Sequence, residues 1–446
     1  MRKFFYIIIA FFAIMACSCE QKSSSSSKTS SVAKLTAFTF VKNDTMPGLG
    51  AAEFTIEERL DTGLVFNKDS MLFGTKLDRV IPRFTFAATP GAAFLTFPDT
   101  TVVLTGYDTL NFNKQPIYLT IRSSDRKVTK VYQIKPTVHQ ADPDLYVWTQ
   151  LNEGIYPEDD SEQRVVEVGE KFIMISSNGF DLDAYSSADG ISWEMLDEVT
   201  GLPAGTKVRQ IVSDSTTLYY GQDSIIYTST DAVTWEAHEV NKKVSTMLFF
   251  WNDQVWASVE EGERYELAIF EDNALIMTGL KPYGDFPISD FATVTFISAS
   301  TRSRAMIIGG FAENGKSLNT RWNLEYSPHI AENNGYRMEE YSIDRPHFTS
   351  LTGISVVNYD DRLMLFGGVN ANRVYLGRDI YVSLDEGLNW TKVDSTKNQL
   401  PEIYQARQKM SAIVRNNYIY LFGGEDAKYT YSDVYRGKLN SINWPK

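Results

Sequence analysis

The sequence feature that most constrains this chain is a pattern that returns near its C-terminal end at a fixed spacing. Residues 364–368 (MLFGG) form an apolar run that ends in a glycine pair, and residues 420–424 (YLFGG) repeat it. Trp390 follows the first run, and Trp444 follows the second run 54 residues later (390 to 444). Repeats of this length that consist of short strands are typical of β-propellers, in which each repeat forms one sheet, or blade. The sequence therefore predicts an all-β fold with a β-propeller over residues 141–446.

The segments between the expected strands carry a second pattern. Residues 383–390 match Ser-x-Asp-x-Gly-x-x-Trp in full, and residues 187–193 and 229–235 are versions one residue shorter. In such a turn Asp accepts hydrogen bonds from backbone amides, Gly adopts a positive φ and Trp fills the space between blades. We therefore interpret these residues as structural turn residues: Ser187, Asp189, Trp193, Ser229, Asp231, Trp235, Ser383, Asp385, Gly387 and Trp390. The motif resembles the Asp box, and the apolar run with its glycine pair resembles the Kelch repeat; both imply a propeller.

The positions at which a fourth strand begins allow the blades to be counted. These positions are Trp148, Trp193, Trp235, Ile276, Tyr336, Trp390 and Trp444. Trp148 has no strand candidates before it in the propeller region, and Trp444 is followed only by Pro445 and Lys446. We therefore predict that residues 146–151 complete the last blade and remove its open edge. This arrangement gives six blades, with seven as the alternative.

Residues 1–16 predict a bacterial lipoprotein signal peptide. Arg2 and Lys3 precede an apolar run at residues 4–16, which is shorter than the roughly 20 residues that span a bilayer. The run ends in Ile-Met-Ala-Cys17, which resembles a lipobox and implies that the Cys17 thiol is diacylated; Cys19 is the alternative lipidation site. Residues 17–33 are rich in Ser and predict a flexible lipidated tether.

Residues 34–140 show a different pattern, with alternation of period two. Short runs rich in β-branched and aromatic residues are separated by turn-like segments such as Pro47-Gly48. Residues 117–121 and 127–134 flank a polar Ser-Ser-Asp-Arg turn and predict a hairpin. About seven strands with no helical periodicity favour a small immunoglobulin-like β-sandwich. The Cys and Trp core of antibody domains is absent, so the pattern indicates the architecture alone.

Composition excludes several classes of function. The formal charge of −13 disfavours binding to nucleic acid. Both cysteines lie before residue 20, so the folded part has no thiol for disulfides, metal ligation or nucleophilic attack. The four histidines are scattered at His139, His238, His329 and His347, and none pairs at ligand spacing. The acidic run at residues 158–160 is interpreted as a solvated loop in preference to a calcium site. We expect no cofactor and no metal.

Two enzyme families share this architecture. Sialidases also carry Asp boxes on a six-bladed propeller, but the Phe/Tyr-Arg-Ile/Leu-Pro string that opens their propeller is absent here; residues 79–82 (RVIP) lie in the sandwich and have the wrong order. Galactose oxidase shares the Kelch architecture, but its chemistry needs a Tyr–Cys crosslink. This chain has no Cys after residue 19, so that chemistry is excluded. We assign no catalytic residue, because spacing along the chain fixes no distance between carboxylates.

Taken as a whole, the chain resembles uncharacterised lipoproteins of Bacteroidota that have an immunoglobulin-like domain and a Kelch or Asp-box propeller. The resemblance implies a lipid-anchored protein of the outer membrane, exposed at the cell surface. We expect a binding or scaffold protein whose propeller mouth engages a glycan or another envelope protein. The alternative is a carbohydrate-active hydrolase of sialidase-like architecture.

Overall fold

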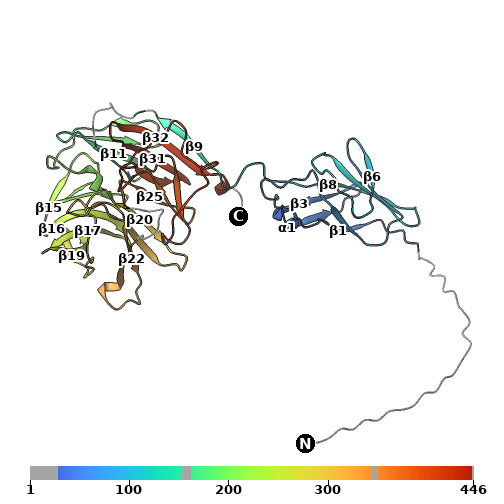
Figure 1. The fold of residues 1–446 in the computed structure, drawn as a ribbon, viewed down its shortest axis with the longest axis horizontal. Helices are drawn as coiled ribbons and strands as arrows, with labels where there is room; N and C mark the ends of the chain where they lie inside the picture. The colour runs from blue at the N-terminus through green and yellow to red at the C-terminus, as the bar shows by residue number, and fades with distance from the viewer. Residues whose placement is uncertain (1–28, 153, 155–161, 343–349, 444–446) are drawn as a thin grey trace, which may run out of the picture. The chain divides into compact units, whose positions relative to one another are not determined.

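The computed structural model describes residues 29–152, 154, 162–342 and 350–443 (Figure 1). The predicted signal peptide, Cys17, Cys19, the Ser-rich run, the acidic run at 158–160, His347 and Trp444 lie outside these residues. The chain divides into an N-terminal unit, Met1–Asp142, and a C-terminal unit, Pro143–Lys446. In both units the regular structure of the described residues is almost entirely β-strand, in agreement with the predicted all-β class.

The N-terminal unit contains two sheets. Strands β1 (Leu35–Phe40) and β4 (Pro82–Phe86) form the smaller one. The larger sheet has the strand order β2 (Phe54–Glu57), β3 (Thr62–Asn67), β8 (Thr129–Lys135), β7 (Ile117–Arg122), β5 (Ala92–Thr96) and β6 (Thr101–Val103). Strands β3 and β8 are parallel, and the other pairs of this sheet are antiparallel. The predicted hairpin is confirmed, since Ile117 of β7 lies opposite Ile134 of β8.

One hydrophobic core joins the two sheets of the N-terminal unit. Ile117, Leu119 and Ile121 alternate along β7 and are fully buried, as period-two patterning requires. They belong to the same cluster as Leu35 and Phe38 of β1, which come from the smaller sheet. One expectation was wrong: the Pro47-Gly48 turn is instead the start of a short helix, α1 (Pro47–Ala51), because Pro is well suited to the first helical position.

The C-terminal unit consists of consecutive antiparallel sheets. In strand order they are β10 (Glu162–Val168), β11 (Lys171–Ser177), β12 (Leu182–Ser187), β13 (Glu194–Met195); β14 (Val212–Ser213), β15 (Leu218–Ser229), β16 (Glu236–Trp251), β17 (Gln254–Glu261), β18 (Arg264–Glu271), β19 (Ala274–Met277); β20 (Ala292–Ile297), β21 (Ser303–Ile308), β22 (Thr320–Tyr326), β23 (Tyr336–Ser342); β25 (Ser355–Tyr359), β26 (Arg362–Phe366), β28 (Ile380–Ser383), β29 (Thr391–Lys392); and β30 (Ser411–Arg415), β31 (Tyr418–Glu425), β32 (Thr430–Leu439), β9 (Tyr146–Asn152). The short pair β24 (Leu351–Thr352) and β27 (Val369–Asn370) and the 3₁₀ helices η1 (Val208–Gln210), η2 (Asn333–Gly335) and η3 (Asn440–Asn443) complete the unit.

The six-stranded sheet is two sheets that share one long strand. The first part of β16 pairs with β15 through residues 236–239, and its second part pairs with β17 through residues 244–251. A register shift between these parts marks the change of partner. The sequence pattern did not predict this shared strand, because strands were expected to end at each turn.

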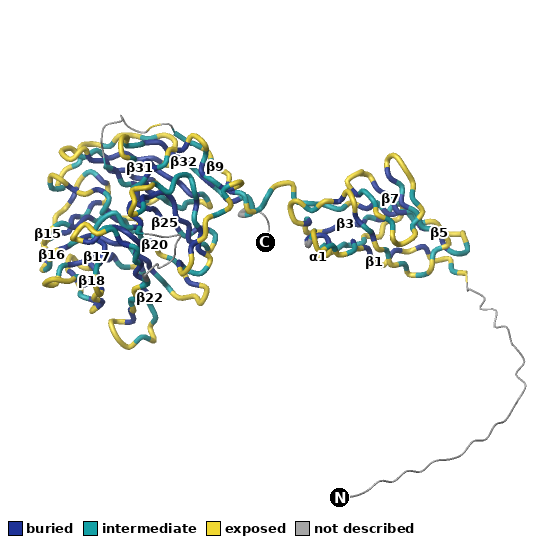
Figure 2. The backbone as a smooth tube through the Cα atoms, viewed as in Figure 1, coloured by how far each residue is buried: buried dark blue, intermediate teal, exposed yellow. Residues whose placement is uncertain are grey.

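Apolar clusters fill the spaces between neighbouring sheets and form a closed circle. The clusters join β10–β13 to β14–β15, β15 to β16–β19, β16–β18 to β21–β23, β20–β21 to β25–β26, and β25–β28 to β30–β32. A last cluster, which contains Phe172 of β11 and Phe422 of β31, joins the final sheet back to the first. Figure 2 shows the buried inner strands of this unit in dark blue.

The circle closes through β9, the first strand of the C-terminal unit. Strand β9 pairs antiparallel with β32, and the register runs from Tyr146 opposite Leu439 to Asn152 opposite Val434. The prediction that residues 146–151 complete the last sheet is therefore confirmed. Figure 1 shows β9 beside β32 although the two strands are almost 300 residues apart in sequence.

Candidate functional site

The strands next to the axis of the C-terminal unit line a small cavity. Its walls come from β10, β14, β16, β20, β25 and β30, together with residues of the loops that enter these strands. The cavity has a volume of about 110 Å³, which is room for a few waters or for one small polar group. Because all of these strands contribute, the cavity is the mouth of the central channel.

The loops that enter the channel are held by a chain of backbone hydrogen bonds. The Gly353 amide donates to the Asp290 carbonyl at 2.8 Å, and the Lys409 amide donates to the Gly353 carbonyl at 2.7 Å. All three residues have a positive φ, between 51° and 63°. For Asp290 and Lys409 this is a sparsely populated backbone conformation, which the surrounding loops must hold in place. The backbone positions of Asp290 and Lys409 at the mouth are therefore fixed.

The glycine pairs, to which Gly309-Gly310 after β21 adds a third, explain how these loops come so close to the sheets. A Cβ atom on Gly310 would lie 2.6 Å from the Ser289 carbonyl oxygen, and one on Gly424 would lie 2.7 Å from the Gln408 carbonyl oxygen. Both glycines have a positive φ, of 90° and 100°. Only glycine fits such contacts. The Kelch-like pairs in the sequence thus mark where a strand end meets a mouth loop.

Charged side chains of both signs face one another at the mouth. Arg209 Nε lies 3.5 Å from Asp290 Oδ1, and Lys409 Nζ lies 4.0 Å from the same oxygen. Lys409 Nζ also lies 3.0 Å from Glu425 Oε1. Burial raises the pKa of the Glu162 carboxyl, while the positive charges of Arg209 and Lys409 act to lower it. A half-buried acid with a raised pKa in a cavity is typical of functional sites.

A larger groove of about 590 Å³ adjoins the cavity and shares Asp290 with it. The groove lies over the loops that connect β21 to β22, β26 to β28 and β31 to β32. Two aromatic side chains line it, Phe311 and Tyr375, beside the amides of Asn370 and Gln408. Sequence reasoning did not identify the cavity or the groove, because their residues come from separate loops and no motif joins them.

The predicted turn residues at 187–193 and 229–235 form closely similar turns. Asp189 Oδ1 accepts hydrogen bonds from the amides of Ile191 and Ser192 at 2.8 and 3.0 Å. Asp231 Oδ1 accepts in the same way from the amides of the second and third residues after it, at 2.8 Å each. The hydrogen bonds from Ser192 and Ile191 lower the pKa of Asp189. Ser187 and Ser229 accept from the amides at positions 190 and 232, at 2.8 and 2.9 Å.

The full motif at 383–390 makes the same turn with one more residue. Asp385 Oδ1 accepts from the Asn389 amide at 2.7 Å, and Ser383 Oγ accepts from the Gly387 amide at 2.8 Å. Gly387 has the positive φ, 82°, that the motif predicts. Two of the motifs connect the third and fourth strands of a four-stranded sheet, at β12–β13 and β28–β29, and the motif at 229–235 connects β15 to β16 of the six-stranded sheet. Trp193, Trp235 and Trp390 lie in clusters between neighbouring sheets.

The turn at 383–390 lies at the opposite end of the strands from the channel mouth. Strand β20 begins at Ala292, which lines the cavity, and ends at Ile297, which lines a hollow together with Asp385. Beyond β20, the Ala299 amide donates to Glu386 Oε1 at 2.9 Å. A strand of this length spans roughly 17–20 Å. The structure therefore does not bring Asp385 together with the charged residues of the mouth.

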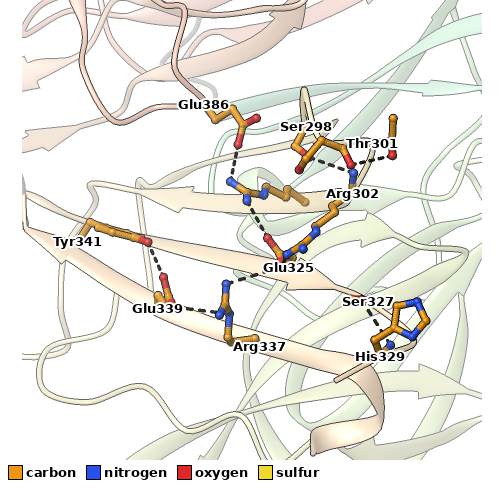
Figure 3. Close-up of polar contacts among 12 residues, drawn as sticks. Ser298, Thr301, Arg302, Glu325, Ser327, His329, Arg337, Glu339, Tyr341 and Glu386 are labelled. Carbon is orange, nitrogen blue, oxygen red and sulfur yellow. Dashed lines mark hydrogen bonds and ion pairs between the residues drawn. The ribbon is translucent and has the colours of Figure 1, made fainter. Parts of the chain in front are cut away.

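An ion-pair cluster surrounds Glu325 of β22 at the same end (Figure 3). Glu325 is buried, and its oxygens lie 2.5 Å from Arg302 Nη1 and 2.7 Å from Arg304 Nη2. Although burial acts to raise it, the hydrogen bonds from these two arginines lower the pKa of Glu325. Arg304 also pairs with Glu386 of the next sheet, and Arg337 lies 3.7 Å from Glu325. Each arginine of the cluster has an acidic partner, and the pair of Arg304 with Glu386 connects two neighbouring sheets.

The described residues lack two features that would point to other functions. In the described ranges, no group of three or more His, Cys, Asp or Glu side chains is arranged to hold a metal ion. Among the helices of the same residues, none has the length and apolar character needed to cross a membrane.

A closed circle of sheets around a central channel, completed by a strand from its own beginning, defines a β-propeller. The chain belongs to the DUF6242 family: residues 142–446 match the DUF6242 beta propeller domain, and residues 22–135 match the N-terminal domain of unknown function of the same family. No curated protein matches the chain. A solved structure titled "Structure of YjhT" is similar with a TM-score of 0.45 and 14% identity, over 63% of this chain and 95% of that chain.

Proposed function

We propose that this protein is a lipid-anchored binding protein of the cell envelope whose propeller mouth holds a glycan. The observation that carries the proposal is the charged cavity at the channel mouth with an aromatic and amide-lined groove beside it. Sugar hydroxyls need hydrogen-bond donors and acceptors, and sugar faces need apolar area such as Tyr375 offers. An envelope protein as the ligand is the second candidate.

The finer architecture is part of the proposal. Six blades rather than seven are supported by the circle of apolar clusters, which joins each group of strands to the next and the last to the first. For the N-terminal unit we propose an immunoglobulin-like sandwich, supported by two sheets that share one core. Such a unit would act as a spacer between the membrane anchor and the propeller.

A carbohydrate-active hydrolase remains the rival function, and one observation favours it. Glu162 is a half-buried acid with a raised pKa in the channel mouth, where Asp290 also lies. A pair of carboxyl groups with different environments is what glycoside hydrolysis requires. The rival predicts that sugar is released as product and that Glu162→Gln stops the release.

Binding at the mouth is tested by two variants on a panel of cell-surface oligosaccharides. Tyr375→Ala removes an aromatic face of the groove and is expected to weaken binding about tenfold, or roughly 1.4 kcal/mol. Asp385→Ala is the matched control at the other end of the strands. It should cost on the order of 1–2 kcal/mol of stability through the lost hydrogen bonds to a carboxylate, with binding unchanged.

The readouts are the dissociation constant, the release of reducing sugar and the unfolding midpoint. Equal binding by wild type and Tyr375→Ala would contradict a site at the mouth. Lost binding or turnover in Asp385→Ala with an unchanged unfolding midpoint would contradict the structural interpretation of the Asp-box turns. Release of sugar that depends on Glu162 would replace the binding role with the hydrolase.

The lipid anchor is tested at Cys17. Cys17→Ala should abolish metabolic labelling by a palmitate analogue, because the thiol of the first residue after cleavage carries the diacylglycerol in the lipobox resemblance. Cys19→Ala is the matched variant and should leave the labelling intact. Labelling that survives in Cys17→Ala and disappears in Cys19→Ala would move the lipidation site, and labelling that survives loss of both cysteines would contradict the anchor.

A further inference from the structure

Arg164 of β10 lines the channel mouth, and no described residue supplies a counter-charge to its guanidinium. Within the described ranges the side chain makes no ion pair and no hydrogen bond, and its Nε atom is buried without a partner. Burial, together with the neighbouring positive charge of Arg209, lowers the pKa of Arg164 to about 10, so the group stays charged at neutral pH. A half-buried charge without a described partner is costly and therefore calls for an explanation.

The neighbours of Arg164 do not neutralise it. Arg209 shares the single carboxylate of Asp290 with Lys409, and Lys409 is in addition paired with Glu425. The cavity is also lined by Lys207 and Glu162, and burial disfavours the charged form of Glu162. Among the described residues, Asp290 and Glu425 pair with Arg209 and Lys409, and no acid forms an ion pair with Arg164, in a protein whose formal net charge is −13.

A guanidinium in this state fits one kind of ligand group. Its planar fork of N–H donors matches a carboxylate in a bidentate pair, which is stronger than a neutral hydrogen bond. The pair gains further strength where protein walls replace part of the surrounding water, and the cavity of about 110 Å³ provides such walls. The groove that leaves this cavity has aromatic and amide side chains suited to the remainder of a saccharide, including Phe311, Tyr375 and Asn370.

We infer that Arg164 binds the carboxylate of an acidic sugar at the channel mouth, with the adjoining sugar units in the groove of Phe311 and Tyr375. The inference rests on the proposed glycan-binding function and specifies its ligand class. Arg209 lies beside the carboxylate and adds a second positive charge, while its pairing with Asp290 holds it in place. Neutral glycans leave the Arg164 charge unpaired and therefore bind more weakly.

The experiment compares oligosaccharides that differ only in their carboxyl groups. Uronic-acid oligosaccharides from pectin, alginate and hyaluronan are titrated calorimetrically into the purified protein, beside the same oligosaccharides after chemical reduction of the carboxyl groups. At least one acidic form should bind ten times or more tighter than its reduced form. Arg164→Met should abolish this preference, whereas Arg264→Met, on the exposed end of β18, should leave it unchanged.

Each other outcome overturns a defined part of the inference. Equal affinity for the acidic and reduced forms would overturn the inference. It would also be overturned if Arg164→Met keeps the preference for the acidic form while its tryptophan fluorescence shows a folded propeller. Equal binding of a sulfated oligosaccharide would overturn the choice of carboxylate, and binding of an acidic peptide alone would overturn the glycan. If neutral saccharides bind and Tyr375→Ala abolishes their binding, the proposed function stands without this inference; if no saccharide binds, both fail.

Discussion

Replacing residues 144–152 by a Gly–Ser linker of equal length is expected to open the propeller. The variant should elute as oligomers or aggregates, and any folded fraction should unfold at least about 10 °C below the wild type. Size-exclusion chromatography and tryptophan fluorescence measure both effects. All eight tryptophans lie between residues 148 and 444, so their fluorescence reports on the propeller alone.

The large effect follows from the contacts that β9 makes. Its ladder with β32 covers the outer edge of the last sheet, and each hydrogen bond of such a ladder contributes about 0.5–1.5 kcal/mol. Tyr146 is buried in the cluster between the last two groups of strands, where Trp148 packs edge-on against Phe366. Two large aromatic side chains contribute roughly 1.5–3 kcal/mol each. Together these terms are comparable with the total stability of about 5–15 kcal/mol of a domain.

A matched control and a rescue make the closure experiment specific. Replacing residues 22–28 of the tether by the same kind of linker should change neither elution nor unfolding. A synthetic peptide of residues 143–152, added to the linker variant, should occupy the free edge of β32 and restore monomers. A linker variant that is monomeric and unfolds at the wild-type temperature would show that β9 does not hold the circle closed.

Those parts of the fold that local chemistry dictates were predicted from the sequence. The glycine pairs and Trp390 gave the repeat, and the isolated position of Trp148 gave the closing strand, which the structure confirms. The predicted strands did not include β2, which has only four residues, or β5, whose residues do not alternate between apolar and polar. The shared strand β16 was missed because its change of partner depends on two neighbouring sheets.

The residues of the channel mouth were not predicted, although a ligand site at the propeller mouth was expected. Arg164, Arg209, Asp290 and Lys409 lie on separate loops and strand starts spread over almost 250 residues, and only the closed circle brings them together. Each of them, taken in sequence, is an ordinary charged residue next to an expected strand. The four residues share one feature that the sequence shows: each lies just before or in the first strand of a repeat. This feature points to a common site only when the number of repeats and their order around the axis are known.

Arg407→Met is expected to destabilise the propeller by about 3–5 kcal/mol, because it leaves the Asp433 carboxylate buried without its partner. Arg407 is 1% exposed and donates from Nη1 and Nη2 to the two oxygens of Asp433. Its guanidinium carbon lies 3.8 Å from the centre of the Tyr431 ring and 4.5 Å from that of Tyr404. Although burial acts to lower it, the hydrogen bonds with Asp433 raise the pKa of Arg407.

The double variant Arg407→Met/Asp433→Asn separates the charge from the packing. It removes both charges and should lose much less stability than the sum of the two single variants, because the cost of the single change lies mainly in the carboxylate left alone. Arg264→Met, at an exposed site, should change the stability by less than about 0.5 kcal/mol. The measurement is denaturant unfolding followed by tryptophan fluorescence. Additive losses in the double variant would mean that the ion pair itself contributes little. Arg407 would then act through its contacts with the tyrosine rings and with the Gly423 carbonyl oxygen, which lies 3.1 Å from Nη1.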